Sequence, residues 1–238
     1  MRSLLTAFGL MLLLDCSAQR TVDVTSGDTR IDQNSFFVVN GTPFVNVKFV
    51  SLVEGTPYFT DEWRKGVLVS ETGQEYKGLL LKLDLYENAI HFQDEKGVEM
   101  ITVSPIKEVV LTDAQGNNAR FVRASSVKAS IDSKSEWLQW LYSGTASLYK
   151  LYDKKYFEQR PYNSATTEQH IKTNEKFLVL VNGVFLEIKK LKDAPSVLAG
   201  KKTELEEFLK NKDDKNASVD DRFVALIEYY NTLLKEQK

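Results

Sequence analysis

The sequence predicts a mostly β, α+β protein: an antiparallel β-meander or open roll, a second β-hairpin unit, and two or three C-terminal helices. Residues 58–111 contain at least five short apolar runs separated by turn residues, which is typical of neighbouring strands joined by tight turns. Asn182 and Gly183 separate two further apolar runs, and this dipeptide is a strong hairpin signal. From residue 218 onward the apolar residues recur at helical spacing instead.

Residues 1–18 are predicted to be a cleaved secretory signal peptide. Arg2 precedes an apolar run at residues 4–14, and small residues follow at 16–18, where a signal peptidase would cut after Ala18 or Gln19. The apolar run is too short to span a bilayer, and no later run approaches the necessary length. We therefore expect an exported protein without a membrane span, located in the periplasm or outside the cell, or associated with the outer membrane.

Cys16 raises the alternative of a lipoprotein signal in which the cysteine is acylated after cleavage. Asp15 stands where such a site has a small residue, so lipidation at Cys16 ranks second. Cleavage after Ala18 leaves a chain without cysteine, which excludes disulfides, thiol catalysis and cysteine-based metal sites. The polar residues 19–35 are expected to form a flexible N-terminal arm.

The charges of the chain are balanced. There are 31 basic and 33 acidic residues, which give a formal net charge of -2. Because no broad basic field is available to attract phosphates, we expect no nucleic-acid partner.

Residues 36–130 are predicted to form the antiparallel β domain. Asn40 and Gly41 indicate a first hairpin between runs at 36–40 and 44–53. In residues 79–86 leucines alternate with other residues, as expected for a strand with one buried face. Gly78 indicates a bulge, and Pro105 marks a break or an edge before the last run. The short links require consecutive strands to pair as a meander.

Residues 131–192 are predicted to form a β-hairpin extension with a long loop. Residues 125–135 are small and polar and would make a seam before it. Ser133 and Glu136 have the spacing of a capping box, so one or two helical turns are expected to carry Trp137 and Trp140. A strand follows at 146–152, and the polar residues 154–176 are interpreted as a surface loop that precedes the Asn182 hairpin.

Residues 193–238 are predicted to form a helical segment packed on the sheet. Pro195 and Gly200 have the positions that favour the start and the end of a short helix. Two capping boxes, at residues 203–206 and 218–221, predict two further helices. The last helix has an apolar stripe that should lie against the sheet or the preceding helix.

Five segments carry a resemblance to known proteins: DEWRKGVLV at 61–69, EYKGLLLKLDLYENAIHF at 75–92, LYKLY at 148–152, KTELEEFLKNK at 202–212 and EYYNTL at 228–233. Together they resemble secreted or envelope proteins common in Bacteroidota. This resemblance implies an exported protein of a Gram-negative cell. It implies no named activity and carries over no catalytic or binding residue.

Candidate catalytic chemistry is sparse in the sequence. His91 and His170 are the two histidines; the first is expected on a strand face and the second in the predicted loop. No serine-nucleophile elbow is present, and the aspartates at 213–214 and 220–221 lack the spacing of a calcium loop. Acidic residues near strand ends leave carboxylate-based hydrolysis open as an alternative. We predict no catalytic residue, no metal site and no cofactor.

Aromatic residues are the candidate binding residues. They gather just before the predicted meander and again around the strand at 146–152. If they reach one exposed face they would form a stacking platform for a glycan, a peptide or a protein partner. The competing interpretation, which we favour, is that they pack against the sheet. The candidates are Tyr58, Phe59, Trp63, Tyr149, Tyr152 and Tyr156.

The leading hypothesis for function is an exported, non-catalytic module that binds a protein, glycan or other component of the cell envelope. The first alternative is a carboxylate-dependent hydrolase that acts on an envelope polymer or glycan. The second alternative is a structural envelope subunit. An exposed aromatic patch favours the binder, two facing carboxylates in a cleft favour the enzyme, and recovery in a constitutive complex favours the structural subunit.

Overall fold

The computed structural model describes residues 21–23, 41–43, 50–127, 131, 133–163, 166–198, 200–211 and 214–235. The predicted signal peptide at 1–18, and all of the predicted N-terminal arm except 21–23, lie outside the described residues.

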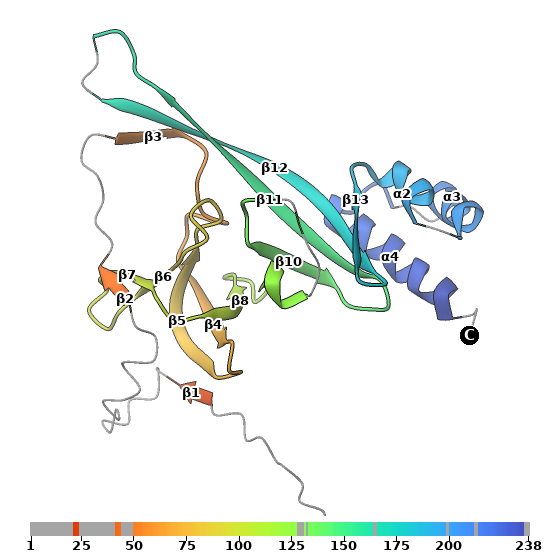
Figure 1. Ribbon diagram of the computed structural model, residues 1–238, viewed down its shortest axis with the longest axis horizontal. Coiled ribbons are helices and arrows are strands. Elements are labelled where there is room, and N and C mark those ends of the chain that lie inside the picture. The colour runs from red at the N-terminus through yellow and green to blue at the C-terminus, as the bar shows by residue number, and fades with distance from the viewer. Residues whose placement is uncertain are drawn as a thin grey trace, which may run out of the picture.

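One hydrogen-bonded sheet contains the strands of the described chain (Figure 1). The strands are β1 (Thr21–Asp23), β2 (Gly41–Pro43), β3 (Val50–Glu54), β4 (Arg64–Ser70), β5 (Glu75–Leu83), β6 (Ile90–Gln93), β7 (Glu99–Thr102), β8 (Ile106–Thr112), β9 (Asn118–Arg123), β10 (Trp137–Tyr142), β11 (Ser147–Gln159), β12 (Thr167–Val181) and β13 (Val184–Ile188). Their order is β13-β12-β11-β10-β9-β8-β4-β5-β6-β7-β2. Neighbours along this order are antiparallel, whereas β1 and β3 add parallel to β5 and β12. The mostly β, α+β prediction is confirmed.

The first half of the sheet is an open roll. Strands β4 to β7 pair consecutively, as predicted, but β8 pairs with β4 and not with β7. From Thr102 to Ile106 the chain spans four Cα steps, which reach at most about 15 Å. A flat sheet would separate β7 from β8 by four strand spacings, or about 19 Å. The sheet therefore curls back on itself, and a purely flat meander is ruled out.

The interior of the roll is lined by the predicted leucine face. Leu81, Leu83 and Leu85 are buried, and they pack with Phe121 and other residues of β4, β6, β8 and β9. The predicted bulge at Gly78 is confirmed, because the register between β4 and β5 shifts there and Gly78 has a φ of 80°.

Strand β10 replaces the predicted helical turns at the start of the second half. Trp137 and Leu138 are both buried, so β10 has apolar neighbours on both faces and its sequence shows no alternation. A short apolar run of this kind does not distinguish a strand from a helix. The Ser133 hydroxyl accepts a hydrogen bond from the Ser135 backbone within a turn and does not cap a helix. Because β10 pairs with β9, the sheet continues across the predicted seam.

A second correction concerns the hairpin expected at Asn40 and Gly41. Gly41 lies in β2, which pairs with the β7 edge, and therefore does not form a hairpin turn. Residues 36–40 and 44–49 lie outside the described part of the chain. The hairpin at Asn182 and Gly183 is confirmed, with φ angles of 52° and 76° at the two turn residues.

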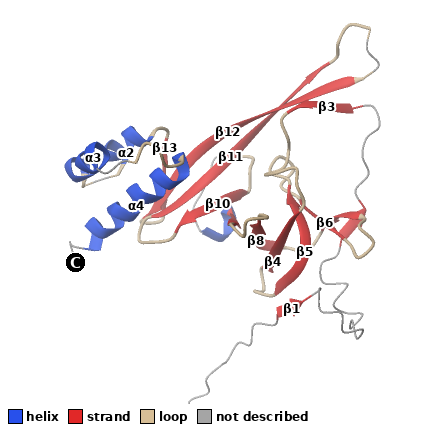
Figure 2. Ribbon diagram, turned by 180° about the vertical axis from the view of Figure 1, so that it is seen from behind, coloured by secondary structure: helices blue, strands red, loops and turns tan. Residues whose placement is uncertain are grey.

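Helices cover one face of the β10 to β13 half (Figure 2). They are α2 (Ala194–Val197), α3 (Lys202–Asn211) and α4 (Val219–Lys235), with short 3-10 turns η1 (Ala124–Val127) and η2 (Leu191–Asp193). Phe223, Leu226 and Ile227 of α4 are buried against Leu148 and Phe177 of the sheet. Among the described residues no helix is long and apolar enough to cross a membrane.

One of the two predicted capping boxes holds. The Ser218 hydroxyl accepts the backbone N–H of Asp221 at 3.1 Å at the start of α4, as predicted. Helix α3, however, begins at Lys202, so Thr203 lies inside it and is not its cap.

The most extended element is a long hairpin that β11 and β12 form beyond the rest of the sheet (Figure 1). The surface loop predicted at 154–176 is therefore wrong, since these residues continue both strands. Lys172, Thr173 and Glu175 are exposed on β12. Water reaches both faces of the hairpin, so the apolar alternation that marks a half-buried strand is missing.

Candidate interaction surface

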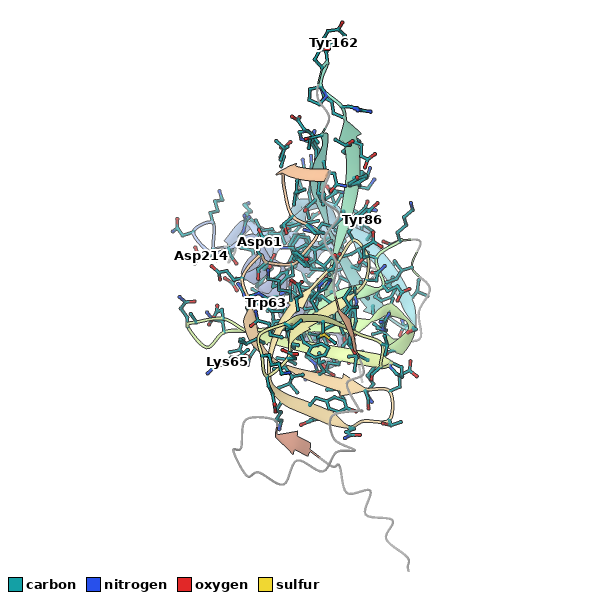
Figure 3. The ribbon with its side chains drawn as sticks, turned by 90° about the vertical axis from the view of Figure 1, so that its left-hand side faces the viewer. Asp61, Trp63, Lys65, Tyr86, Tyr162 and Asp214 are labelled. Atoms are coloured by element: carbon teal, nitrogen blue, oxygen red, sulfur yellow. The ribbon has the colours of Figure 1, made fainter. Side chains whose placement is uncertain are left out.

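The outer part of this hairpin is the candidate functional surface and is called the β-arm. It comprises residues 154–159 of β11, residues 167–171 of β12, the described residues between them, and the strand β3 that pairs with β12. Figure 3 shows Tyr162 at its far end, well beyond Trp63 and the roll.

Three contacts fix the base of the β-arm on the roll. The Lys154 ammonium donates hydrogen bonds of 2.9 Å to the carbonyl oxygens of Thr56 and Tyr58. Burial of this ammonium lowers the pKa of Lys154 from its ordinary value. The Tyr156 ring lies 5.6 Å from the Tyr86 ring. These contacts define the direction in which the β-arm leaves the body.

Large apolar side chains are exposed along the β-arm. Tyr162 at its tip is 96% exposed and Phe157 is 49% exposed, while Leu52 and Val53 on β3 are 43% and 55% exposed. A hollow of about 250 Å³ lies beside Phe157. Its lining residues are Glu54, Phe157, Glu158, Gln159, His170 and Lys172. Sequence reasoning missed the part of this surface around Phe157 and Tyr162 because it assigned residues 154–176 to a loop.

The predicted aromatic residues do not gather on one exposed face. Phe59 and Tyr152 meet inside the roll, where their ring centroids are 5.7 Å apart and both pack on Phe121. Burial raises the pKa of the Tyr152 phenol above its ordinary value. Phe59 and Tyr152 therefore belong to the core and not to an exposed platform.

Tyr58 and Trp63 do lie together, on the outside of the roll. The Lys82 ammonium lies 5.1 Å from the Tyr58 ring centroid and 4.8 Å from the Trp63 ring centroid. The edge of Tyr58 meets buried His91, whose Nδ1 lies 2.7 Å from the Glu99 carboxylate. Burial and three nearby carboxylates raise the pKa of Tyr58 to about 12. The stacking positions between the two aromatic rings are thus occupied by the chain's own lysine.

Tyr149 belongs to a third, separate group. It stacks on Trp140 of β10 at 5.9 Å and meets the edge of Phe185 of β13 at 5.7 Å. On the other side of Trp140, the Arg120 guanidinium of β9 lies 4.1 Å from the ring centroid. Because Trp140 is enclosed between neighbouring strands, this row is a cross-strand stack. Tyr149 itself is buried, so it cannot be part of an exposed platform.

Of the six predicted residues, Tyr156 alone lies on the β-arm. Its phenol hydrogen-bonds to Glu158 on the same strand and to Gln169 on β12.

No protein family, curated protein or solved structure matches the chain. The resemblance to exported Bacteroidota proteins therefore stays a prediction.

Two of the acidic residues that line surface hollows pair with basic side chains. Glu136 pairs with Arg123 in one hollow, and Asp153 lies 3.9 Å from Lys176 at another. Within the described residues no group of three His, Cys, Asp or Glu side chains is placed to hold a metal ion.

Proposed function

We propose that the protein is an exported, non-catalytic interaction module that engages a protein partner of the cell envelope through the β-arm. The observation that carries the proposal is the nearly full exposure of Tyr162 at the tip of a long, anchored hairpin. Phe157, Leu52 and Val53 extend the exposed apolar surface along the same element.

The β-arm contributes little to the core that holds the fold together. A two-stranded hairpin is only marginally stable by itself, and ordering each of its residues costs about 1–2 kcal/mol in backbone entropy. Contacts of Lys154 and Tyr156 hold its base, but Tyr162 packs into none of the hydrophobic clusters. A role in binding accounts for an ordered hairpin that ends in an exposed aromatic residue.

The chemistry of the tip favours a protein as the partner. Tyrosine and arginine are enriched among the residues that contribute most to protein–protein affinity, and Arg160 and Tyr162 are exposed just beyond the end of β11. A glycan would instead stack on open aromatic faces. Trp140 and the Tyr58–Trp63 pair are already in contact with Arg120 and Lys82 of the same chain.

The alternative of a carboxylate-dependent hydrolase has less support. A glycosidase needs two facing carboxyl groups, one of which has a raised pKa. Arg123 and His170 instead engage Glu136 and Glu54 at the hollows of this protein. A structural subunit would use the same β-arm and would differ from a binding module in holding its partner constitutively. Export itself rests on the signal-like residues 1–18.

A photocrosslinking amino acid placed at position 162 of the full-length chain tests the proposal in the native envelope. The matched control carries the same amino acid at Glu228, which is exposed on α4 far from the β-arm. We expect one discrete protein adduct from position 162, which the additional substitution Phe157→Ser weakens. A discrete adduct from position 228 with none from position 162 would show that binding occurs elsewhere on the chain.

A further inference from the structure

The imidazole of His170 lies between carboxylates of two different strands. Its Nδ1 is 3.3 Å from an Oε atom of Glu54 on β3, and its Nε2 is 3.9 Å from an Oε atom of Glu168 on β12. Nε2 is buried and has no hydrogen-bond partner among the described residues. An ionised carboxylate can only accept hydrogen bonds, and a neutral imidazole has a single N–H. Only the protonated ring can direct an N–H toward both carboxylates.

Little apolar surface of strand β3 is buried against β12. Leu52 and Val53 remain 43% and 55% exposed, and the β3–β12 register shifts between Gln169 and His170. Where the chain leaves β3, a Cβ on Gly55 would lie 2.0 Å from the carbonyl oxygen of Ile171, so glycine allows the chain to pass directly against β12. The contact between His170 and Glu54 is therefore the ion pair that joins β3 to β12 among the described residues, whereas Glu168 lies on the same strand as His170.

Other charged groups near His170 partly compensate each other. Glu158 of β11 and Lys172 of β12 line the same hollow as His170. In the register of the hairpin, Phe157 lies opposite His170 and Lys155 lies opposite Lys172. Lys155 is therefore the next residue along the same face as Phe157. The carboxylates of Glu54 and Glu168 lie nearest to the nitrogen atoms of the His170 ring.

We propose that His170 is a pH-dependent clasp that fastens β3 to β12 within the β-arm. The inference rests on the proposed function, because β3 supplies Leu52 and Val53 to the binding surface. Histidine changes its charge between about pH 5 and 8. In the acid form both carboxylates are paired and β3 is held on β12. In the neutral form the charge attraction between the ring and Glu54 is lost, and β3 separates from β12 more often.

Hydrogen exchange of the chain alone, at pH 5.5 and pH 7.5, tests the clasp without any partner. After correction for the intrinsic exchange rate, we expect the amides of residues 50–54 and 167–170 to be protected about twofold to fivefold more at pH 5.5, the range for one partly exposed ion pair. Peptides from β5 and α4 report global stability and serve as the internal reference. Equal protection of β3 at the two pH values would overturn the proposal.

Three variants assign the effect to the ring. H170Q keeps hydrogen-bonding capacity without a titratable charge and should bring the protection ratio close to one, and E54Q should do the same. E158Q is the matched control from the same hollow and should leave the ratio unchanged. A ratio that persists in H170Q would also overturn the proposal. The measurement needs no partner, so its failure is distinguishable from failure of crosslinking at position 162.

Discussion

Asn231 is predicted to be the polar residue on which attachment of α4 to the sheet depends most. Its side chain is 3% exposed and accepts the Ala146 N–H at 2.8 Å while it donates to the Ala146 carbonyl oxygen at 2.8 Å. The second amide hydrogen is donated to the Ile227 carbonyl oxygen, also at 2.8 Å. Ala146 is fully buried, so water does not reach the backbone groups that Asn231 satisfies.

The substitution Asn231→Ala should lower the free energy of unfolding by about 1.5–5 kcal/mol. It leaves the N–H and the C=O of Ala146 buried without partners, at a cost of about 1–3 kcal/mol each. The higher helix propensity of alanine returns roughly 0.5–0.7 kcal/mol. The Ile227 carbonyl oxygen remains within the α4 hydrogen-bond pattern, so its loss adds little.

Urea unfolding of the purified chain measures this change through the midpoint at constant slope. Glu228→Ala is the matched control, because it lies exposed on the same helix and should change stability by less than about 0.5 kcal/mol. A loss below about 1 kcal/mol for Asn231→Ala, with an unchanged slope, would refute the assigned role of the amide.

Gly144 provides a second test of the same contact. A Cβ at this position would lie 2.7 Å from the Oδ1 atom of Asn231. Gly144→Ala should therefore destabilise the natural chain by about 1–3 kcal/mol and cost much less when Asn231 is already alanine. Strictly additive costs would contradict the close approach, since contacting residues are expected to couple.

Three further predictions follow from other parts of the fold. Lys150 is buried and its ammonium lies 2.9 Å from carboxylate oxygens of Glu175 and Asp220. Lys150→Met should lower the free energy of unfolding in urea by about 1–2 kcal/mol, less than the 3–5 kcal/mol of a fully buried pair, because water can solvate both carboxylates. The control Lys155→Met, at an exposed position, should change stability by no measurable amount. The pKa of Tyr58 is raised to about 12, so between about pH 10 and 12 unfolding releases a proton and stability falls as pH rises. The lowered pKa of Lys154 makes stability rise with pH, but only below the ordinary lysine pKa of about 10.5. Between pH 9 and pH 11, urea unfolding should show a smaller loss of stability for Tyr58→Phe than for the natural chain; an equal loss would assign the effect to other groups. Mass spectrometry of the chain from its native host should find an N-terminus at Gln19 or Arg20, and a start at acylated Cys16 would establish the lipoprotein alternative.

Local signals in the sequence predicted the features that depend on neighbouring residues alone. Asn182 and Gly183 form the expected turn because both adopt left-handed backbone angles that these residue types tolerate. Ser218 caps α4 through the backbone three residues later. Leu79, Leu81 and Leu83 of β5 face the core because one side of that strand is buried.

Features that depend on distant parts of the chain were not predictable from these patterns. Strand β10 is apolar on both faces and the β-arm is polar on both faces, so neither shows the alternation of a half-buried strand. The pairing of β8 with β4 follows from curvature of the whole roll. For Asn231 a signal did exist, since it lies four residues after Ile227 on the apolar stripe of α4.

The candidate site was predicted least well. Its six aromatic residues were grouped by their closeness in sequence, but β-strand geometry sends successive side chains to opposite faces. Tyr149 and Tyr152 thus face different clusters although they lie on one strand. Tyr162 has no sequence feature that distinguishes it from a buried tyrosine, and its exposure emerged only with the direction of the β-arm.

Recovery of a complex from the native envelope, with the natural chain and with a Tyr162→Ala, Phe157→Ser double variant, tests the central proposal most directly. Both residues are exposed, so the variant should keep its thermal unfolding midpoint while the loss of two interface anchors weakens the complex by about 30-fold or more. A complex that survives the double substitution at full yield would show that the β-arm is not the binding surface.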